Sequence, residues 1–375
     1  VRTDTRVCNL SYLQTDWYID QMRRPAYDSP SVPISWPRID YCSGTNEMIQ
    51  VMPDLKKQIL DFYKANPAEA KKQFGDDPFE LKNIMKYWVR GKNNDQHVIP
   101  TDTVYVTIDK EAVKKSGMLI VDTIPDKMVI SLVGKDALYK NDLMMLEMIA
   151  QSNWTRPLYI ATTVGQDNYM NLGDNFILEG LANRITPFKT TKPGVKNIDT
   201  EKMYYNVMKR FKYGGLSQPG LYIDETLMRM CYTHRRLLAQ LANALIDEHK
   251  NAKALNVLNK AEKEIPEYNV PMNYVSGGYD LAKAYMRLGK KAKAFAILNK
   301  MWTNATQYLT WYMSLDYNRF RQSMYDCNVH FQTMYFMIDL AKNADPAWSQ
   351  KHNVIFEQLY THYHNIGGQD PDPQQ

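Results

Sequence analysis

The stretch LANALIDEHKNAKALNVLNK at residues 241–260 returns as LAKAYMRLGKKAKAFAILNK at residues 281–300, an offset of 40 residues (241 to 281). Ten of the twenty aligned positions are identical. A repeat of this length, with small and apolar residues at helical spacing, predicts two helical hairpins that bury their apolar faces by stacking. The identical small and apolar positions are Leu241/Leu281, Ala242/Ala282, Ala244/Ala284, Ala252/Ala292, Ala254/Ala294 and Leu258/Leu298.

A turn at Gly289 and a break at Pro266 complete the pattern, which is typical of tetratricopeptide-like units. Such stacks present surface to partners and rarely carry reactive groups. Helical spacing continues beyond the repeat, and no convincing strand follows Tyr222. We therefore predict an all-α, tetratricopeptide-like domain over residues 193–375, with a disordered polar tail from about residue 367.

The first half of the chain has a different pattern. Residues 103–108 alternate apolar and polar side chains, which predicts a strand with one buried face. Short helices between the predicted strands favour right-handed crossovers and a mostly parallel sheet. We therefore predict an α/β, Rossmann-like domain over residues 1–192 that ends in a linker at residues 190–194. The other predicted strands are residues 5–10, 128–133 and 157–161.

The composition excludes several classes of protein. The formal net charge of +5 comes from 46 basic and 41 acidic residues spread along the chain, so we expect no nucleic-acid partner. No run of about 18 apolar residues occurs, which predicts no membrane span in this chain. The cysteines lack the spacing of a zinc site and are expected to be buried thiols. The alternative is that two of them form one disulfide. These cysteines are Cys8, Cys42, Cys231 and Cys327.

Polar and aromatic residues gather where two of the predicted strands end. In an open parallel sheet, ligands bind beyond the carboxyl ends of the strands. Asp16 beside Trp17 and Tyr18 suits a sugar, because a carboxylate accepts hydrogen bonds from hydroxyls and rings cover an apolar face. The alternative is that Ser11 or Thr15 caps a helix and that Trp17 belongs to the core. The candidate ligand-binding residues are Asn9, Ser11, Thr15, Asp16, Trp17, Tyr18, Thr162 and Thr163.

Arg156 is a further candidate, for an anionic group of a ligand, although an Arg just before a strand is more often a salt-bridged edge. The glycines lack the spacing of a phosphate-binding loop, and no G-x-S-x-G nucleophile elbow occurs. His362 and His364 have no further ligands at metal-binding spacing. We therefore predict no catalytic residue, no metal site and no cofactor.

Several longer segments carry a resemblance: RVCNLSYL at 6–13, DWYIDQM at 16–22, RPLYIAT at 156–162, LEGLANRI at 178–185 and DET at 224–226. Together they resemble the soluble C-terminal region of a family of multi-spanning membrane proteins from Gram-negative bacteria. That family is similar to protein O-mannosyltransferases. The likeness extends into the hairpins from Leu237 and covers most of the chain.

The resemblance implies a glycosyltransferase-like membrane portion upstream of Val1 that uses a lipid-linked sugar donor, with this chain on the periplasmic face of the inner membrane. The start at Val1 without an initiator Met is expected for a piece of a longer protein. In such enzymes the catalytic acidic residue lies in a loop of the membrane portion, so the resemblance implies no catalytic residue in this chain.

We therefore expect a non-catalytic module for protein O-glycosylation that binds acceptor protein, glycan or its own membrane portion. One alternative is a stand-alone sugar or sugar-phosphate enzyme that uses Asp16 and Arg156. The other is an assembly adaptor that binds peptide or protein through the helical repeats.

Overall fold

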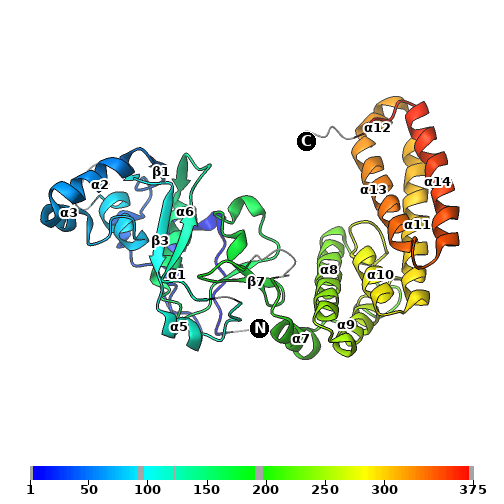
Figure 1. Ribbon diagram of the computed structural model, residues 1–375, viewed down its shortest axis with the longest axis horizontal. Helices are drawn as coiled ribbons and strands as arrows, with labels where there is room; N and C mark the ends of the chain where they lie inside the picture. Colours follow the sequence, from blue (N-terminus) through cyan, green and yellow to red (C-terminus); the bar gives the residue numbers. More distant parts are fainter. Residues whose placement is uncertain (1–2, 92–96, 122, 191–196, 371–375) are drawn as a thin grey trace. The chain divides into compact units, whose positions relative to one another are not determined.

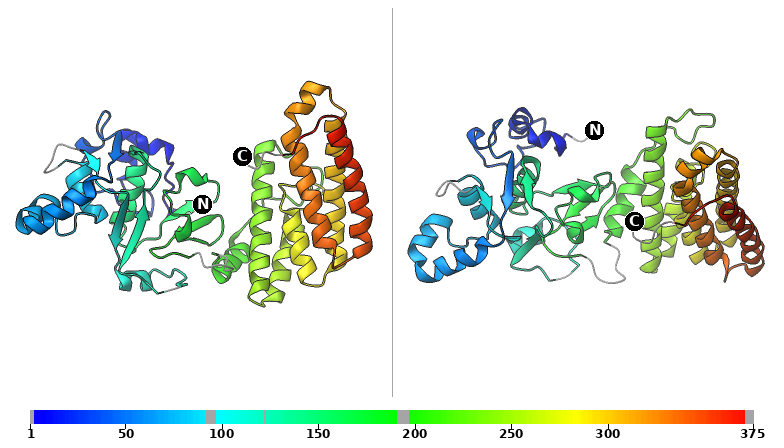
Figure 2. Two further views of the ribbon diagram at one scale, coloured as in Figure 1. Left: turned by 45° about the horizontal axis from the view of Figure 1, so that its top comes forward. Right: turned by 90° about the horizontal axis from the view of Figure 1, so that it is seen from above.

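The computed structural model describes residues 3–91, 97–121, 123–190 and 197–370, and the chain divides into two compact units (Figures 1 and 2). Unit 1 comprises Val1–Leu178 with Ala182–Asn197, and unit 2 comprises Glu179–Leu181 with Ile198–Gln375. Unit 1 combines helices with small sheets, whereas the described elements from Thr200 onward are helical. Most of the predicted linker, residues 191–194, lies outside the described residues.

Helix α6 forms the centre of the core of unit 1. Every residue from Leu143 to Ala150 is buried, which is expected of a helix that is apolar on nearly all sides. The one carboxylate of this stretch, Glu147, accepts hydrogen bonds through Oε1 from the backbone N–H of Ser35 at 2.9 Å and from Ser35 Oγ at 2.6 Å. The proline-rich segment around Ser35 therefore packs against this helix. The helices of unit 1 are α1 (Asp16–Met22), α2 (Leu55–Ala65), α3 (Pro67–Phe74), α4 (Leu81–Asn83), α5 (Lys110–Lys115) and α6 (Lys140–Gln151), with a π-helical turn at Ile84–Val89.

The strands of unit 1 form three small sheets, in the orders β2-β1-β5, β3-β4 and β6-β8-β7. Among the described strands only β1 and β2 pair in parallel, so the prediction of a mostly parallel, Rossmann-like sheet is wrong. In β3 and β4, buried Val104 and Ile130 alternate with exposed residues such as Val129. One-sided burial is typical of antiparallel sheets, because crossover helices cover both faces of a parallel one. The strands are β1 (Met48–Val51), β2 (Val98–Ile99), β3 (Thr103–Thr107), β4 (Lys127–Ser131), β5 (Ala137–Tyr139), β6 (Tyr159–Ala161), β7 (Phe176–Leu178) and β8 (Ala182–Ile185).

The strand predicted at residues 5–10 is also wrong, because residues 5–9 have no regular structure. Side chains hold this segment instead of a ladder of backbone bonds. Arg6 Nη1 donates to the carbonyl of Arg24 at 2.9 Å. Val7, which a buried strand would cover, is 82% exposed.

The helices of unit 2 pack as antiparallel neighbours, α8 on α9, α10 on α11 and α13 on α14, while α8 also packs on α10 and α11 on α13 (Figures 1 and 2). The predicted helical character of this half is therefore confirmed. Five pairs of small and apolar positions that the two copies of the repeat share are buried, from Leu241/Leu281 to Leu258/Leu298, whereas the sixth pair, Ala252/Ala292, is exposed. The helices are α7 (Thr200–Tyr205), α8 (Glu225–Asp247), α9 (Asn251–Glu264), α10 (Gly278–Arg287), α11 (Lys291–Met313), α12 (Tyr317–Gln322), α13 (Met324–Ala341) and α14 (Pro346–Asn365).

The turns of the two repeated hairpins have the same geometry. His249 and Gly289, which occupy equivalent positions of the repeat, both have a left-handed backbone, with φ of 59° and 69°. In the first turn the backbone N–H of Lys250 donates to the carbonyl of Leu245 at 2.8 Å, and the equivalent bond in the second is 2.9 Å long. These bonds close the helices as in a Schellman motif, so the repeat in sequence is also a repeat in local structure.

Replacing His249 by Gly is expected to stabilise unit 2 by about 1 kcal/mol, because a residue with a Cβ is strained in the left-handed region. The reverse change, Gly289→Ala, is expected to destabilise it by about the same amount. No heavy atom lies within 4 Å of the added Cβ at Gly289, so strain is the whole effect. Chemical denaturation of the full chain measures both changes. Changes of the same sign would contradict the explanation.

The described part of the tail, from about residue 367 to residue 370, contacts helix α14. Tyr363 donates its hydroxyl proton to the carbonyl of Gln369 at 2.8 Å, and Tyr360 donates to Asp370 Oδ1 at 2.5 Å. A polar segment is thereby tied to the last helix. Residues 371–375 lie outside the described residues.

The four cysteines are free thiols. Cys231 and Cys327 are buried, as predicted, whereas Cys8 and Cys42 are partly exposed. Burial raises the pKa of Cys327 to about 12, so this thiol is protonated at neutral pH. Cys231 and Cys327 therefore fill space in the core.

Candidate functional site

Most of the predicted ligand-binding residues lie together, on a 3-10 turn at Ser11–Gln14 and on the first turn of α1. Two of them hold the local fold. Asn9 Oδ1 accepts a hydrogen bond from the N–H of Tyr12 at 3.2 Å, and Thr15 Oγ1 donates to the carbonyl of Tyr12 at 2.7 Å. Thr15 is the N-cap residue of α1, but its side chain makes no capping hydrogen bond. Ser11 is exposed on the turn.

Three rings form a cluster on this turn and helix. Trp17 is 56% exposed and Tyr12 is 51% exposed, so the alternative that Trp17 belongs to the core is wrong. The ring centroids of Tyr12 and Trp17 lie 5.8 Å apart, and those of Trp17 and Tyr18 lie 5.5 Å apart. Tyr18 is buried and its hydroxyl accepts the backbone N–H of Asn9 at 2.7 Å. The buried ring thus supports two exposed ones, which we call the Trp17 surface (Tyr12 and Trp17).

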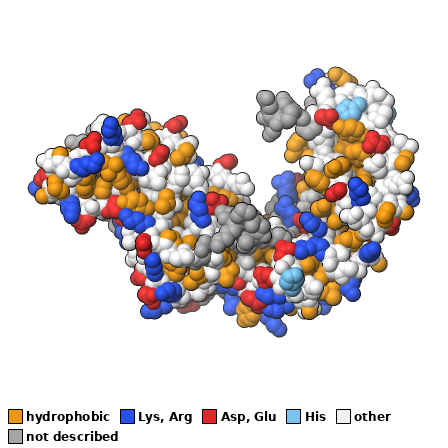
Figure 3. All heavy atoms as spheres, viewed as in Figure 1, with side chains coloured by type: hydrophobic (Ala, Val, Ile, Leu, Met, Phe, Trp, Pro, Cys, Tyr) orange, Lys and Arg blue, Asp and Glu red, His pale blue; other side chains and the backbone are white. Residues whose placement is uncertain are grey.

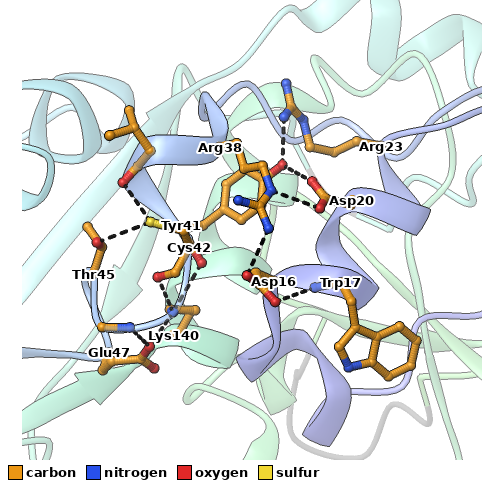
Figure 4. A network of polar contacts seen from close by, with 12 residues as sticks. Asp16, Trp17, Asp20, Arg23, Arg38, Tyr41, Cys42, Thr45, Glu47 and Lys140 are labelled. Carbon is orange, nitrogen blue, oxygen red and sulfur yellow. Dashed lines mark hydrogen bonds and ion pairs between the residues drawn. The ribbon is translucent and has the colours of Figure 1, made fainter.

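Asp16 lies beside Trp17 and pairs with Arg38 (Figure 4). Its Oδ1 accepts the backbone N–H of Trp17 at 2.7 Å, and its Oδ2 lies 3.0 Å from Arg38 Nη2. The Asp16 side chain is 26% exposed and that of Arg38 is 60% exposed. A carboxylate has about four acceptor positions, so about two of those of Asp16 are left for a ligand. The first turn of α1 therefore offers an exposed indole and, from the residue before it, a carboxylate that is paired with a guanidinium.

Asp20 holds Arg38 from the other side. Arg38 Nε lies 3.1 Å from Asp20 Oδ2, while the hydroxyl of Tyr41 donates to Asp20 Oδ1 at 2.6 Å (Figure 4). Arg23 donates in turn to the hydroxyl of Tyr41 at 2.8 Å. The hydrogen bonds from Tyr41 and Arg38 lower the pKa of Asp20, and the bond to Asp20 raises the pKa of Arg38. Both groups are charged at neutral pH, and the guanidinium is fixed before any ligand arrives.

A buried ammonium group lies next to this network (Figure 4). The Lys140 side chain is 1% exposed, and its Nζ lies 2.7 Å from Glu47 Oε1. It also donates to the carbonyls of Tyr41 at 3.1 Å and Cys42 at 3.3 Å. Burial opposes ionisation of Glu47, but the hydrogen bonds from Lys140 and from the backbone N–H of Gly44 outweigh it and lower the pKa of this carboxyl. The pair fastens the loop that carries Tyr41 to the first turn of α6.

Several members of this network were missed from the sequence. One signal was present, since Asp16 and Asp20 are four residues apart and share a helix face. A lysine at the first position of a helix is a second signal, because the helix dipole disfavours a cation there and a partner must compensate. The missed residues are Asp20, Arg23, Arg38, Tyr41, Glu47 and Lys140.

Arg156 binds the protein itself. Its Nη1 donates to the carbonyls of Pro30 at 3.2 Å and Ser31 at 3.1 Å, and its Nη2 donates to Ser29 Oγ at 2.7 Å. It thereby holds the proline-rich segment, and these donors are not directed to an anion.

Thr162 and Thr163 follow β6, which pairs antiparallel with β8. They were placed near Asp16 on the assumption that residues 5–10 form a strand parallel to β6. No such strand exists, so the structure gives no reason to include these threonines in the site.

Within the described ranges, no group of three or more His, Cys, Asp or Glu side chains is placed to hold a metal ion. His362 and His364 are exposed on α14. Nor does that part of the chain contain a helix with the length and apolarity needed to cross a membrane. On the face drawn in Figure 3, basic and acidic side chains are interspersed.

Comparison with known proteins identifies the family. A family model described as TMEM260-associated domain 2 matches residues 1–202, which contain the Trp17 surface, Arg38 and the Lys140–Glu47 pair. No curated protein and no solved structure matches this chain. The matched residues make up more than half of the 375 residues. The chain therefore belongs to the family of TMEM260-associated domain 2.

Proposed function

We propose that this chain is a non-catalytic, sugar-binding module of a membrane protein that attaches O-linked sugars to other proteins. The family association indicates a module related to membrane glycosyltransferases, in agreement with the resemblance to protein O-mannosyltransferases. The observation that carries the binding role is the exposure of Trp17 and Tyr12 beside Asp16 and Arg38.

The binding mode follows from the chemistry of these groups. The apolar face of a sugar ring packs on Trp17, as aromatic side chains favour. Sugar hydroxyls donate to the remaining acceptor positions of Asp16 and accept from Arg38. Because Asp20 already holds Arg38, binding requires little ordering of the guanidinium.

The proposal includes a cellular context. The catalytic acid belongs to a membrane-spanning portion of the same protein, and this chain works beside it at the periplasmic face of the inner membrane, on glycan or acceptor protein. The helical unit serves as a tetratricopeptide-like scaffold. The matching turns at His249 and Gly289, together with the buried repeat positions, support a scaffold of that kind.

Replacing Trp17 by Ala is expected to weaken oligosaccharide binding about tenfold, because the stacking surface is lost. Trp17→Phe should retain part of the affinity, and Asp16→Asn should weaken binding less than Trp17→Ala. Calorimetric titration of the full chain with a panel of oligosaccharides, manno-oligosaccharides included, measures these differences.

Trp311→Ala is the matched control, since this tryptophan of unit 2 is 53% exposed. It should leave sugar binding unchanged. A Trp17→Ala variant that binds every sugar as the parent chain does would refute the binding role. Sugar transfer or hydrolysis by the purified chain, abolished by Asp16→Asn, would instead support a stand-alone enzyme.

A further inference from the structure

Unit 2 carries a second group of clustered rings, which we call the Trp311 surface (Tyr274, Tyr308, Trp311 and Tyr312). Three of its rings stand on α11 at positions i, i+3 and i+4, which share a helix face. The ring centroids of Tyr308 and Trp311 are 6.4 Å apart, and those of Trp311 and Tyr312 are 4.9 Å apart. Tyr274, Tyr308 and Trp311 are 39%, 43% and 53% exposed. The surface is therefore accessible, and its three rings on α11 contact one another.

His330 of α13 supports these rings from below. It is 2% exposed, stacks on Tyr308 with a centroid distance of 5.3 Å, and meets Tyr274 edge to face at 5.1 Å. Burial lowers the pKa of His330 to about 4, so the ring is neutral at neutral pH. The support thus fixes the position of the rings without placing a positive charge beneath them.

The charge next to the Trp311 surface is negative. Burial and then the carboxylate of Asp326 raise the pKa of Tyr274, and the same two causes raise that of Tyr312 to about 12. Within the described residues, Asp326 forms no ion pair and no Lys or Arg lies over these four rings. Other tyrosines of the chain are already covered in this way, as Tyr204 is by Lys253 Nζ at 5.3 Å from its ring centroid.

We propose that the Trp311 surface binds a lysine or arginine side chain of a basic segment in a protein partner, with Asp326 as the counter-charge. The faces of aromatic rings attract cations, and here several faces and an unpaired carboxylate are supplied with no cation of the chain's own. At the Trp17 surface, by contrast, the neighbouring carboxylate of Asp16 is already paired with Arg38, which suits neutral hydroxyls. The two sites lie in different units, so this proposal is independent of the sugar-binding function.

Short peptides that differ only in a central residue test the proposal on the full chain. Peptides with central lysine or arginine should bind, whereas the norleucine peptide, which has nearly the same shape but no charge, should bind at least about tenfold more weakly. The glutamate peptide should not bind. Equal binding of the lysine and norleucine peptides would overturn the proposal. The proposal would also be wrong if no peptide bound and Trp311 instead bound phosphocholine vesicles or manno-oligosaccharides.

Two variants assign the site. Trp311→Ala should lower the affinity for the lysine peptide about threefold to thirtyfold, and Asp326→Asn should lower it and reduce its dependence on salt. Trp17→Ala should have no effect on peptide binding. Thermal unfolding of both variants checks that the substitutions leave the fold intact. Unchanged peptide affinity in both Trp311→Ala and Asp326→Asn would refute the proposed site.

Discussion

Replacing Arg235 by Ala is expected to destabilise unit 2 by about 3 to 5 kcal/mol. Arg235 is fully buried on α8, and burial lowers its pKa to about 10, so the guanidinium is still charged at neutral pH. Its Nη2 donates to the carbonyls of Ile265 at 3.0 Å and Val270 at 2.7 Å, and its Nη1 donates to that of Pro271 at 3.3 Å. The substitution leaves these carbonyls buried without that donor, at about 1 to 3 kcal/mol each, and opens a cavity.

Chemical denaturation of the full chain and hydrogen exchange of residues 265–271 measure the effect. The neighbouring Arg236 provides a matched control, because it is exposed and Arg236→Ala should change the stability by less than about 0.5 kcal/mol. Arg235→Lys should fall between the two, since one ammonium group reaches fewer of the three carbonyls. If Arg235→Ala were no more destabilising than Arg236→Ala, the connection between α9 and α10 would not depend on this guanidinium.

The helical unit could be predicted from the sequence because its signal is local and occurs twice. Leu241 and Leu281 are fixed by helical spacing within their own segments, and both are buried as expected. The sheets were harder, because strand direction depends on pairing between distant residues. The alternation in β3 predicted a strand correctly, but the partner and direction came from β4, which begins 20 positions after β3 ends (107 to 127). The alternation of buried and exposed side chains in β3 was a signal for antiparallel pairing, because it leaves one face of the strand uncovered.

The candidate site likewise contains residues that could be predicted from the sequence and residues that could not. Asp16, Trp17 and Tyr18 follow one another in sequence, so their closeness could be read directly. Arg38 and Lys140 reach the same region through the fold, and Lys140 is 93 residues from its partner Glu47. A pair so far apart leaves no local pattern in one sequence. What the sequence could indicate was the need for a partner, because a lysine at a helix N-terminus in an apolar helix is unfavourable alone.

Acidification from pH 6.5 to pH 4 is expected to lower the stability of unit 2 by about 3 kcal/mol through His330 alone. Burial lowers the pKa of His330 from 6.5 to about 4 in the folded chain. Between these pH values the unfolded chain binds a proton that the folded chain does not, so the free energy of unfolding falls as the pH falls. The contribution is complete above pH 6.5 and is lost on approaching pH 4.

His330→Phe isolates the contribution of His330 to the acid loss of stability, because phenylalanine keeps the ring contacts with Tyr308 and Tyr274 but takes up no proton. Denaturation at pH 7 and pH 4.5 should show the variant losing about 2 to 3 kcal/mol less than the parent chain. Burial also lowers the pKa values of His234 and His352, which titrate in both proteins, so their effect cancels in the difference. An equal acid loss in His330→Phe would mean that the folded chain binds a proton on this ring as readily as the unfolded chain does, and the pKa lowered by burial would then be wrong.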